Sequence, residues 1–112
     1  MNENEFKKIC KLSELKEKQG RRFYIDEVDV AVFKVDGVVY ALSNICPHQH
    51  STVMYDGFIE NEKVVCPVHG WEFKLCDGTI GEGRKGLDSY EVKIENDDVY
   101  VKVFKRELKW NF

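Results

Sequence analysis

The chain has 112 residues, of which 43% are hydrophobic and 33% charged, a composition that predicts one globular domain over 1–112 and excludes a disordered chain. Its net charge of −3 argues against a nucleic-acid-binding surface, and no apolar run is long enough to span a bilayer. The polar, acidic first five residues do not resemble a signal peptide, so we expect a cytoplasmic protein whose four cysteines are thiols or metal ligands.

The first part of the chain alternates apolar and polar residues with a period of two, which predicts β-strands. A bend or a single helical turn is expected at residues 13–16. The pair Asp36-Gly37 is typical of a two-residue hairpin turn, because both residue types tolerate positive φ. The predicted strands of this part span residues 6–11, 21–25, 28–34 and 38–42.

The segment from residue 43 to about residue 83 differs from its flanks, since it contains all three histidines, three of the four cysteines and both prolines. Within it, short strands are predicted at 58–59, 63–65 and 71–73. The alternation returns at 90–95 and 99–104, on either side of a turn at 96–98. The pattern therefore predicts an all-β protein, with a scaffold made from both ends of the chain and a loop-rich insert at about 43–83.

Two loops carry the residues with metal-binding chemistry. The first reads Cys-Pro-His at 46–48, and the second, after 17 intervening residues, reads Cys-Pro-Val-His at 66–69. Each loop offers one thiolate and one imidazole, which is the supply that a Rieske-type [2Fe–2S] centre needs, with two cysteines on one iron and two histidines on the other. Zinc also accepts two cysteines and two histidines, but zinc fingers usually pair cysteine with cysteine and histidine with histidine. The predicted ligands are Cys46, His48, Cys66 and His69.

The motif and the residues around it resemble the Rieske family of [2Fe–2S] proteins, and the likeness covers roughly residues 5–104. It includes the start of the chain at 6–15, the hairpin at 30–42, the second loop with its following strand at 66–73, and the strand that begins at 87–92. The resemblance implies the Rieske fold, in which three stacked antiparallel sheets form a small cluster-binding subdomain on a larger base. It also implies one [2Fe–2S] cluster per chain.

Departures from the family pattern indicate which branch the chain resembles. His50 and Ser51 stand where the family usually has glycine, or glycine and then cysteine. Val68 replaces a further cysteine of respiratory Rieske proteins, so their loop-bracing disulfide is not expected. Trp71 and Phe73 replace a serine and a tyrosine whose hydroxyls bond to cluster sulfurs. Because fewer donors to sulfur lower the reduction potential, the chain resembles the low-potential ferredoxin branch.

Other residues near the motif have structural interpretations. His50 could replace His48 as a ligand, but the family register places it at the rim of the cluster. Cys10 and Cys76 match no family ligand and are expected to be structural thiols. Trp71 is expected to pack beneath the cluster loops together with its neighbour Phe73. The tail at 105–112 is expected to be a helical turn or a disordered end.

The resemblance implies a one-electron carrier, not an enzyme, that passes electrons from a reductase to a terminal oxygenase. The implied partners are these two proteins, with no nucleic acid and no membrane, and the carrier is expected to be a monomer. Two alternatives stay open. One is the small subunit of an assimilatory nitrite reductase, which shares the fold but often lacks the cluster ligands. The other is a regulatory module in which the cluster senses redox state.

Overall fold

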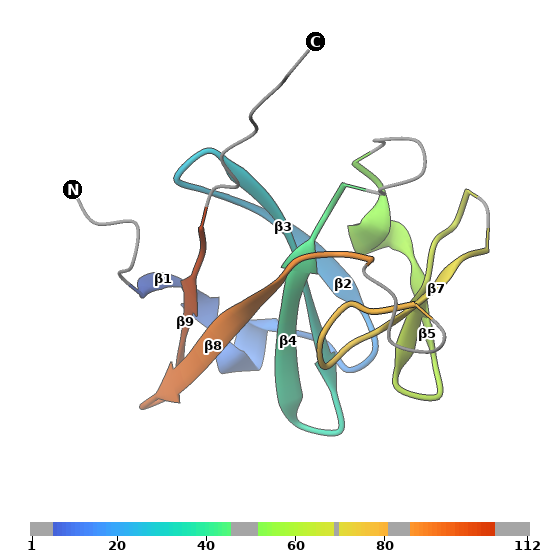
Figure 1. Ribbon diagram of the computed structural model, residues 1–112. Coiled ribbons are helices and arrows are strands. Elements are labelled where there is room, and N and C mark those ends of the chain that lie inside the picture. Colours follow the sequence, from blue (N-terminus) through green and yellow to red (C-terminus); the bar gives the residue numbers. More distant parts are fainter. Residues whose placement is uncertain (1–5, 46–51, 69, 81–85, 105–112) are drawn as a thin grey trace, which may run out of the picture.

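Two antiparallel sheets of different size make up the computed structural model, which describes residues 6–45, 52–68, 70–80 and 86–104 (Figure 1). The larger sheet has the strand order β1-β9-β8-β4-β3-β2, and the smaller has the order β5-β6-β7. The all-β prediction is confirmed, and the predicted strands differ from the observed ones by at most two residues at either end. The elements are β1 (Lys7–Lys11), η1 (Leu12–Glu14), β2 (Gly20–Ile25), β3 (Val28–Val35), β4 (Val38–Ser43), η2 (Met54–Asp56), β5 (Phe58–Glu60), β6 (Lys63–Val65), β7 (Glu72–Lys74), β8 (Ser89–Glu95) and β9 (Asp98–Lys102).

Two-residue turns with positive φ close the β2–β3, β3–β4, β5–β6 and β8–β9 hairpins. In the β3–β4 turn, Asp36 has φ 52° and Gly37 has φ 80°, as the sequence predicted. This backbone conformation matches the right-handed twist of the paired strands, which explains why such short loops suffice. The turn residues are Asp26, Glu27, Asp36, Gly37, Asn61, Glu62, Asn96 and Asp97.

The number of sheets differs from the three that the resemblance implied. Strand β8 pairs with β4 through Ala41↔Tyr90 and Leu42↔Ser89, and this short ladder joins two of the expected sheets into one. The joined sheet curves until β1 approaches β2 at its two ends (Figure 1). Among the described residues, no helix is long and apolar enough to cross a membrane.

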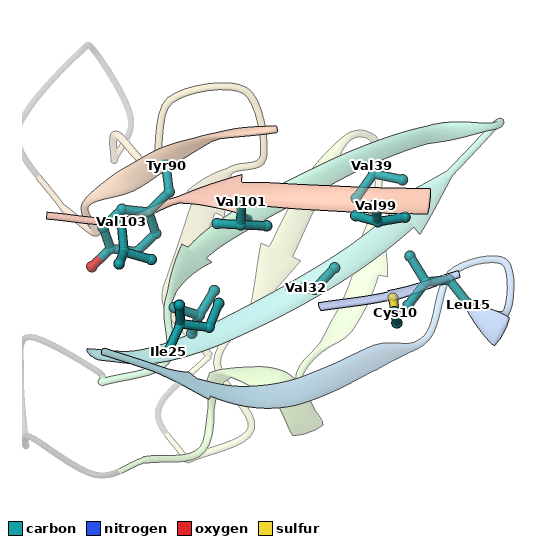
Figure 2. Close-up of a cluster of buried hydrophobic side chains, with 11 residues drawn as sticks. Cys10, Leu15, Ile25, Val32, Val39, Tyr90, Val99, Val101 and Val103 are labelled. Carbon is teal, nitrogen blue, oxygen red and sulfur yellow. The ribbon is translucent and has the colours of Figure 1, made fainter. Parts of the chain in front are cut away.

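Strand β3 is the centre of the molecule, because both of its faces are buried. Its near-continuous apolar sequence is typical of a strand covered on both sides. Val32 faces a core inside the curved sheet, together with Val99 and Val101 of β9 (Figure 2). Ala31 and Phe33 face a second core, which lies between the large sheet and the small one. The small sheet is therefore packed on a rigid base.

Candidate metal centre

The second predicted ligand loop begins at Cys66, directly after β6, whose last two residues are buried. Only 1% of Cys66 is exposed. Its backbone N–H donates to the Trp71 carbonyl at 2.8 Å, and its carbonyl accepts from the Gly70 N–H at 2.9 Å. Gly70 has φ +75°, and a Cβ at this position would meet no atom within 4 Å. The loop is thus a closed turn, with the thiol at its buried root and open space beside Gly70.

The first predicted ligand loop leaves β4 and returns to η2. On its two sides, Ile45 and Thr52 form an antiparallel bridge. The Met54 N–H donates to the Asn44 carbonyl at 3.2 Å, so the ends of the loop lie side by side. These contacts fix the two ends of the loop to each other, as is needed to hold two metal ligands in a constant position. The tip itself, residues 46–51, lies outside the described residues.

The roots of the two loops meet in one buried cluster. Leu42 precedes the first loop, Met54 follows it, and both belong to the apolar cluster that contains Cys66. After η2, Gly57 lies against β6: a Cβ on Gly57 would be 2.5 Å from the carbonyl oxygen of Val65. The exit of the first loop is therefore in contact with the strand that leads into the second loop.

The described part of the site fits a [2Fe–2S] cluster in its donor chemistry. Cys66 supplies a thiol, a ligand that iron–sulfur clusters favour, from an apolar and largely dry environment. The other three predicted ligands, Cys46, His48 and His69, lie outside the described residues, as does His50. Within the residues that are described, no group of three or more His, Cys, Asp or Glu side chains is placed to hold a metal ion. The four-ligand set therefore stays a prediction from the sequence.

The residues that were expected to have a structural role differ in how deeply they are buried. Cys10 is buried in the core of the curved sheet, and desolvation raises the pKa of its thiol. Cys76 is instead exposed, in the turn after β7, because Leu75 takes the buried position there. Phe73 is fully buried, as expected. Trp71 is 38% exposed and touches Phe73 with a ring-centroid distance of 6.5 Å, so it is only partly packed beneath the loops.

Sequence reasoning missed a buried polar network behind the first loop. Asn44 is fully buried at the end of β4, and its side chain contacts Asp29 of β3. Arg22 of β2 binds the same carboxylate with two hydrogen bonds, and this interaction raises the pKa of the guanidinium. Asn44 immediately follows the apolar alternation of β4, but nothing in the sequence identifies its partners, which come from other strands.

Comparisons with known proteins agree with this geometry. A family model for the Rieske-like [2Fe–2S] domain matches residues 5–102. The ferredoxin component of naphthalene 1,2-dioxygenase/salicylate 5-hydroxylase systems from Ralstonia sp. is 36% identical over 77 residues, which are 67% of this chain and 73% of the relative.

Solved structures share the same architecture. A Mycobacterium tuberculosis protein, assigned as the small subunit of an NADH-dependent nitrite reductase, superposes with a TM-score of 0.84 at 22% identity, over 92% of this chain and 98% of that one. A chain of the complex between reduced oxygenase and oxidised ferredoxin of carbazole 1,9a-dioxygenase gives a TM-score of 0.74 at 27% identity, over 84% and 98%. With a family model that matches almost its whole length, the chain belongs to the Rieske-like [2Fe–2S] domain family.

Proposed function

We propose that the protein is a Rieske-type ferredoxin, an electron-transfer component that carries single electrons from a reductase to a terminal oxygenase. The observation that carries this proposal is its 36% identity to a ferredoxin component of an oxygenase system, in a chain that keeps both Cys–His loops. One [2Fe–2S] cluster per chain supplies the reversible one-electron chemistry when bound.

The proposed ligands are the thiolates of Cys46 and Cys66 and the imidazoles of His48 and His69. The spacing in the sequence and the family match support this set. The buried position of Cys66 at the root of a closed turn supports its own assignment. The small sheet lies within the segment proposed as the cluster-binding subdomain, at about 43–83, of a single domain over 1–112.

The described residues of the second loop suit the approach of a protein partner. Val68 is 47% exposed and Trp71 is 38% exposed, which places apolar surface on both sides of Gly70. A partner that covers this surface would exclude water between the two redox centres and bring them close. The net charge of −3 would favour a partner with a basic docking patch. That the carrier is monomeric and cytoplasmic stays a prediction from the sequence.

The small subunit of a nitrite reductase is the second candidate, because a protein so assigned superposes closely. At 22% identity this likeness concerns the fold, whereas the ferredoxin relative is 36% identical. The proposal of a ferredoxin also explains why both Cys–His loops are present. A redox-sensing module is the third candidate. Neighbouring genes discriminate among them: reductase and oxygenase genes support the ferredoxin, and a sirohaem reductase gene supports the second candidate.

Electron transfer to an oxygenase tests the function directly. The dithionite-reduced protein is mixed without oxygen with an oxidised Rieske oxygenase from the same organism, and both visible spectra are followed by stopped flow. We expect one electron per chain to pass to the oxygenase, and none from a Cys66→Ser variant. If the wild-type protein stays reduced with the oxygenase but copurifies with a sirohaem reductase from native cells, the second candidate is correct.

A further inference from the structure

Asn44 connects both ends of the first cluster loop to the central strand. Its backbone N–H donates to the Asp29 carbonyl at 3.0 Å, and its carbonyl accepts from the Met54 N–H at 3.2 Å. Its side-chain N–H donates to Asp29 Oδ1 at 3.0 Å, and its side-chain oxygen accepts from the Tyr55 N–H at 2.7 Å. One buried residue thus ties β3, the start of the loop and η2 together.

The carboxylate of Asp29 is itself fixed by Arg22. The guanidinium donates from Nε to Oδ1 at 2.9 Å and from Nη2 to Oδ2 at 2.7 Å. These two parallel charge-assisted hydrogen bonds define the plane of the Asp29 carboxylate. Its Oδ1 atom also accepts a hydrogen bond from the side-chain N–H of Asn44, and this bond orients the Asn44 amide. Asp29 is 8% exposed and Asn44 is fully buried, so water cannot easily replace these bonds.

We propose that Asn44 is a positioning residue for the first cluster loop, and that Asp29 and Arg22 act through it by holding its amide. The inference rests on the proposed function, because the loop carries the assigned ligands Cys46 and His48. Asn44 lies two residues before Cys46, so a shift at the root of the loop is transmitted to the ligands. Supporting residues behind a metal site hold its ligands in their orientation, and the loss of such residues weakens metal binding.

The β3–β4 ladder holds the start of the loop on β3 as far as Ser43, one residue before Asn44. The bridge between Ile45 and Thr52 fixes the two sides of the loop to each other. The Asn44 side chain adds hydrogen bonds that link η2 to Asp29 of β3, a strand whose two faces are buried in the two cores. Without the amide, the partly buried Tyr55 N–H and the buried Asp29 carboxylate each lose a hydrogen-bond partner, and the root of the loop can move relative to the base.

Cluster retention and cluster geometry measure this role independently of electron transfer. Iron release from the oxidised protein to a chelator gives a rate, and the electron paramagnetic resonance spectrum of the reduced protein reports the ligand geometry. We expect Asn44→Ala to release iron at least tenfold faster than wild type and to broaden the spectrum. Val99→Ala is the matched control, because Val99 is fully buried in the other core and its truncation lowers the melting temperature without contacting the loop.

Arg22→Ala provides a second test, since this side chain is 47% exposed and its loss is easier to tolerate. It should accelerate release about threefold, and the double variant should release iron no faster than Asn44→Ala alone, because Arg22 acts through Asn44. If Asn44→Ala does not fold, the inference is tested with the other two variants: Arg22→Ala should release iron faster than Val99→Ala does for the same loss in melting temperature. Release rates that track the melting temperature equally in all variants would overturn the inference, whereas a wild-type protein without a cluster would overturn the proposed function instead.

Discussion

Cys66 and Cys76 illustrate how burial separates a candidate ligand from an ordinary thiol. Cys66 is 1% exposed at the root of a closed turn, whereas Cys76 is exposed in the turn after β7. Cys66→Ser should abolish the visible spectrum of the cluster and its bound iron, because a hydroxyl is a much poorer iron ligand than a thiolate. Cys76→Ser is the matched control and should keep both. Retention of the cluster in Cys66→Ser, or its loss in Cys76→Ser alone, would show that the assignment is wrong.

The role of a residue could be predicted from the sequence where that role depends on the chemistry of its own side chain. Cys66 is predicted as a ligand from the Cys-Pro-Val-His motif alone, and the structure shows this cysteine to be buried. The positions of Trp71 and Cys76 could not be predicted, because exposure depends on which neighbour takes the buried place, and here Phe73 and Leu75 do so. The role of Asn44 was missed for a related reason: its partners are brought to it by the pairing of other strands.

Gly57, the residue after η2, packs closely against β6 and so sets the distance between the exit of the first ligand loop and the strand that leads into the second. A Cβ on Gly57 would lie 2.5 Å from the Val65 carbonyl oxygen and 2.9 Å from a methyl of Val64. Either the backbone at Gly57 or strand β6 must therefore move in Gly57→Ala, which should cost about 2 kcal/mol of unfolding free energy, as overpacking typically does. The cluster should also be lost faster. Urea unfolding and iron release measure the two effects.

Gly37→Ala is the control for that prediction. It places alanine at φ +80° in the β3–β4 turn, where a Cβ would meet nothing within 4 Å. The left-handed backbone alone should cost about 1 kcal/mol, and the rate of cluster loss should not change. If Gly57→Ala and Gly37→Ala lose the cluster at the same rate, the contact between Gly57 and β6 does not position the loops.

Strands β1 and β9 are joined by ion pairs whose contribution depends on pH. Asp98 lies 3.3 Å from the Lys8 amine and 3.5 Å from the Lys11 amine. Desolvation raises the pKa of Asp98, but its hydrogen bonds and ion pairs with the two lysines outweigh this effect, and the pKa is lowered. A carboxylate with a lowered pKa stabilises the fold above its ordinary pKa of about 4, and this contribution is lost as pH falls through the lowered value.

Asp98→Asn should therefore lower the melting temperature at pH 7, and the difference from wild type should disappear between about pH 4 and pH 2. Thermal melts followed by circular dichroism at each pH measure it. Glu91→Gln is the matched control, because it removes a charge from the adjacent strand β8 at a residue outside these two ion pairs. If the difference in melting temperature between Asp98→Asn and wild type is the same at all pH values, the charge of Asp98 does not stabilise the fold.

The sequence predicted those elements that have a hydrophobic alternation or a turn motif of their own. It did not predict features that depend on contacts between distant parts of the chain. The period-two alternation and the Asp36-Gly37 turn predicted the β3–β4 hairpin almost to the residue. The short helix η2 was missed because its one buried residue, Met54, gives no periodicity. The pairing of β4 with β8 was missed as well, since the two strands are far apart in the sequence and meet over only two residue pairs.

For the whole molecule, the reduction potential is the property that most clearly distinguishes branches of the Rieske family. Phe73 is fully buried and, like Trp71, has no hydroxyl that could donate to a cluster sulfur. Hydroxyl donors to sulfur stabilise the reduced cluster and raise its potential. Because Trp71 and Phe73 provide no such donor, the midpoint potential should lie near the low end of the Rieske range, at about −150 mV. Protein-film voltammetry at neutral pH measures it. A value above about +200 mV would contradict the assignment to the low-potential branch.

One [2Fe–2S] cluster, held between the two Cys–His loops of this β scaffold, is the feature on which the proposed function depends. Its presence can be measured by metal and acid-labile sulfide analysis of anaerobically purified protein, together with electron paramagnetic resonance of the reduced form. We expect about two irons and about two sulfides per chain, and a Rieske-type signal with a low average g. One tightly bound zinc ion without iron or sulfide, in protein purified from native cells, would contradict this expectation.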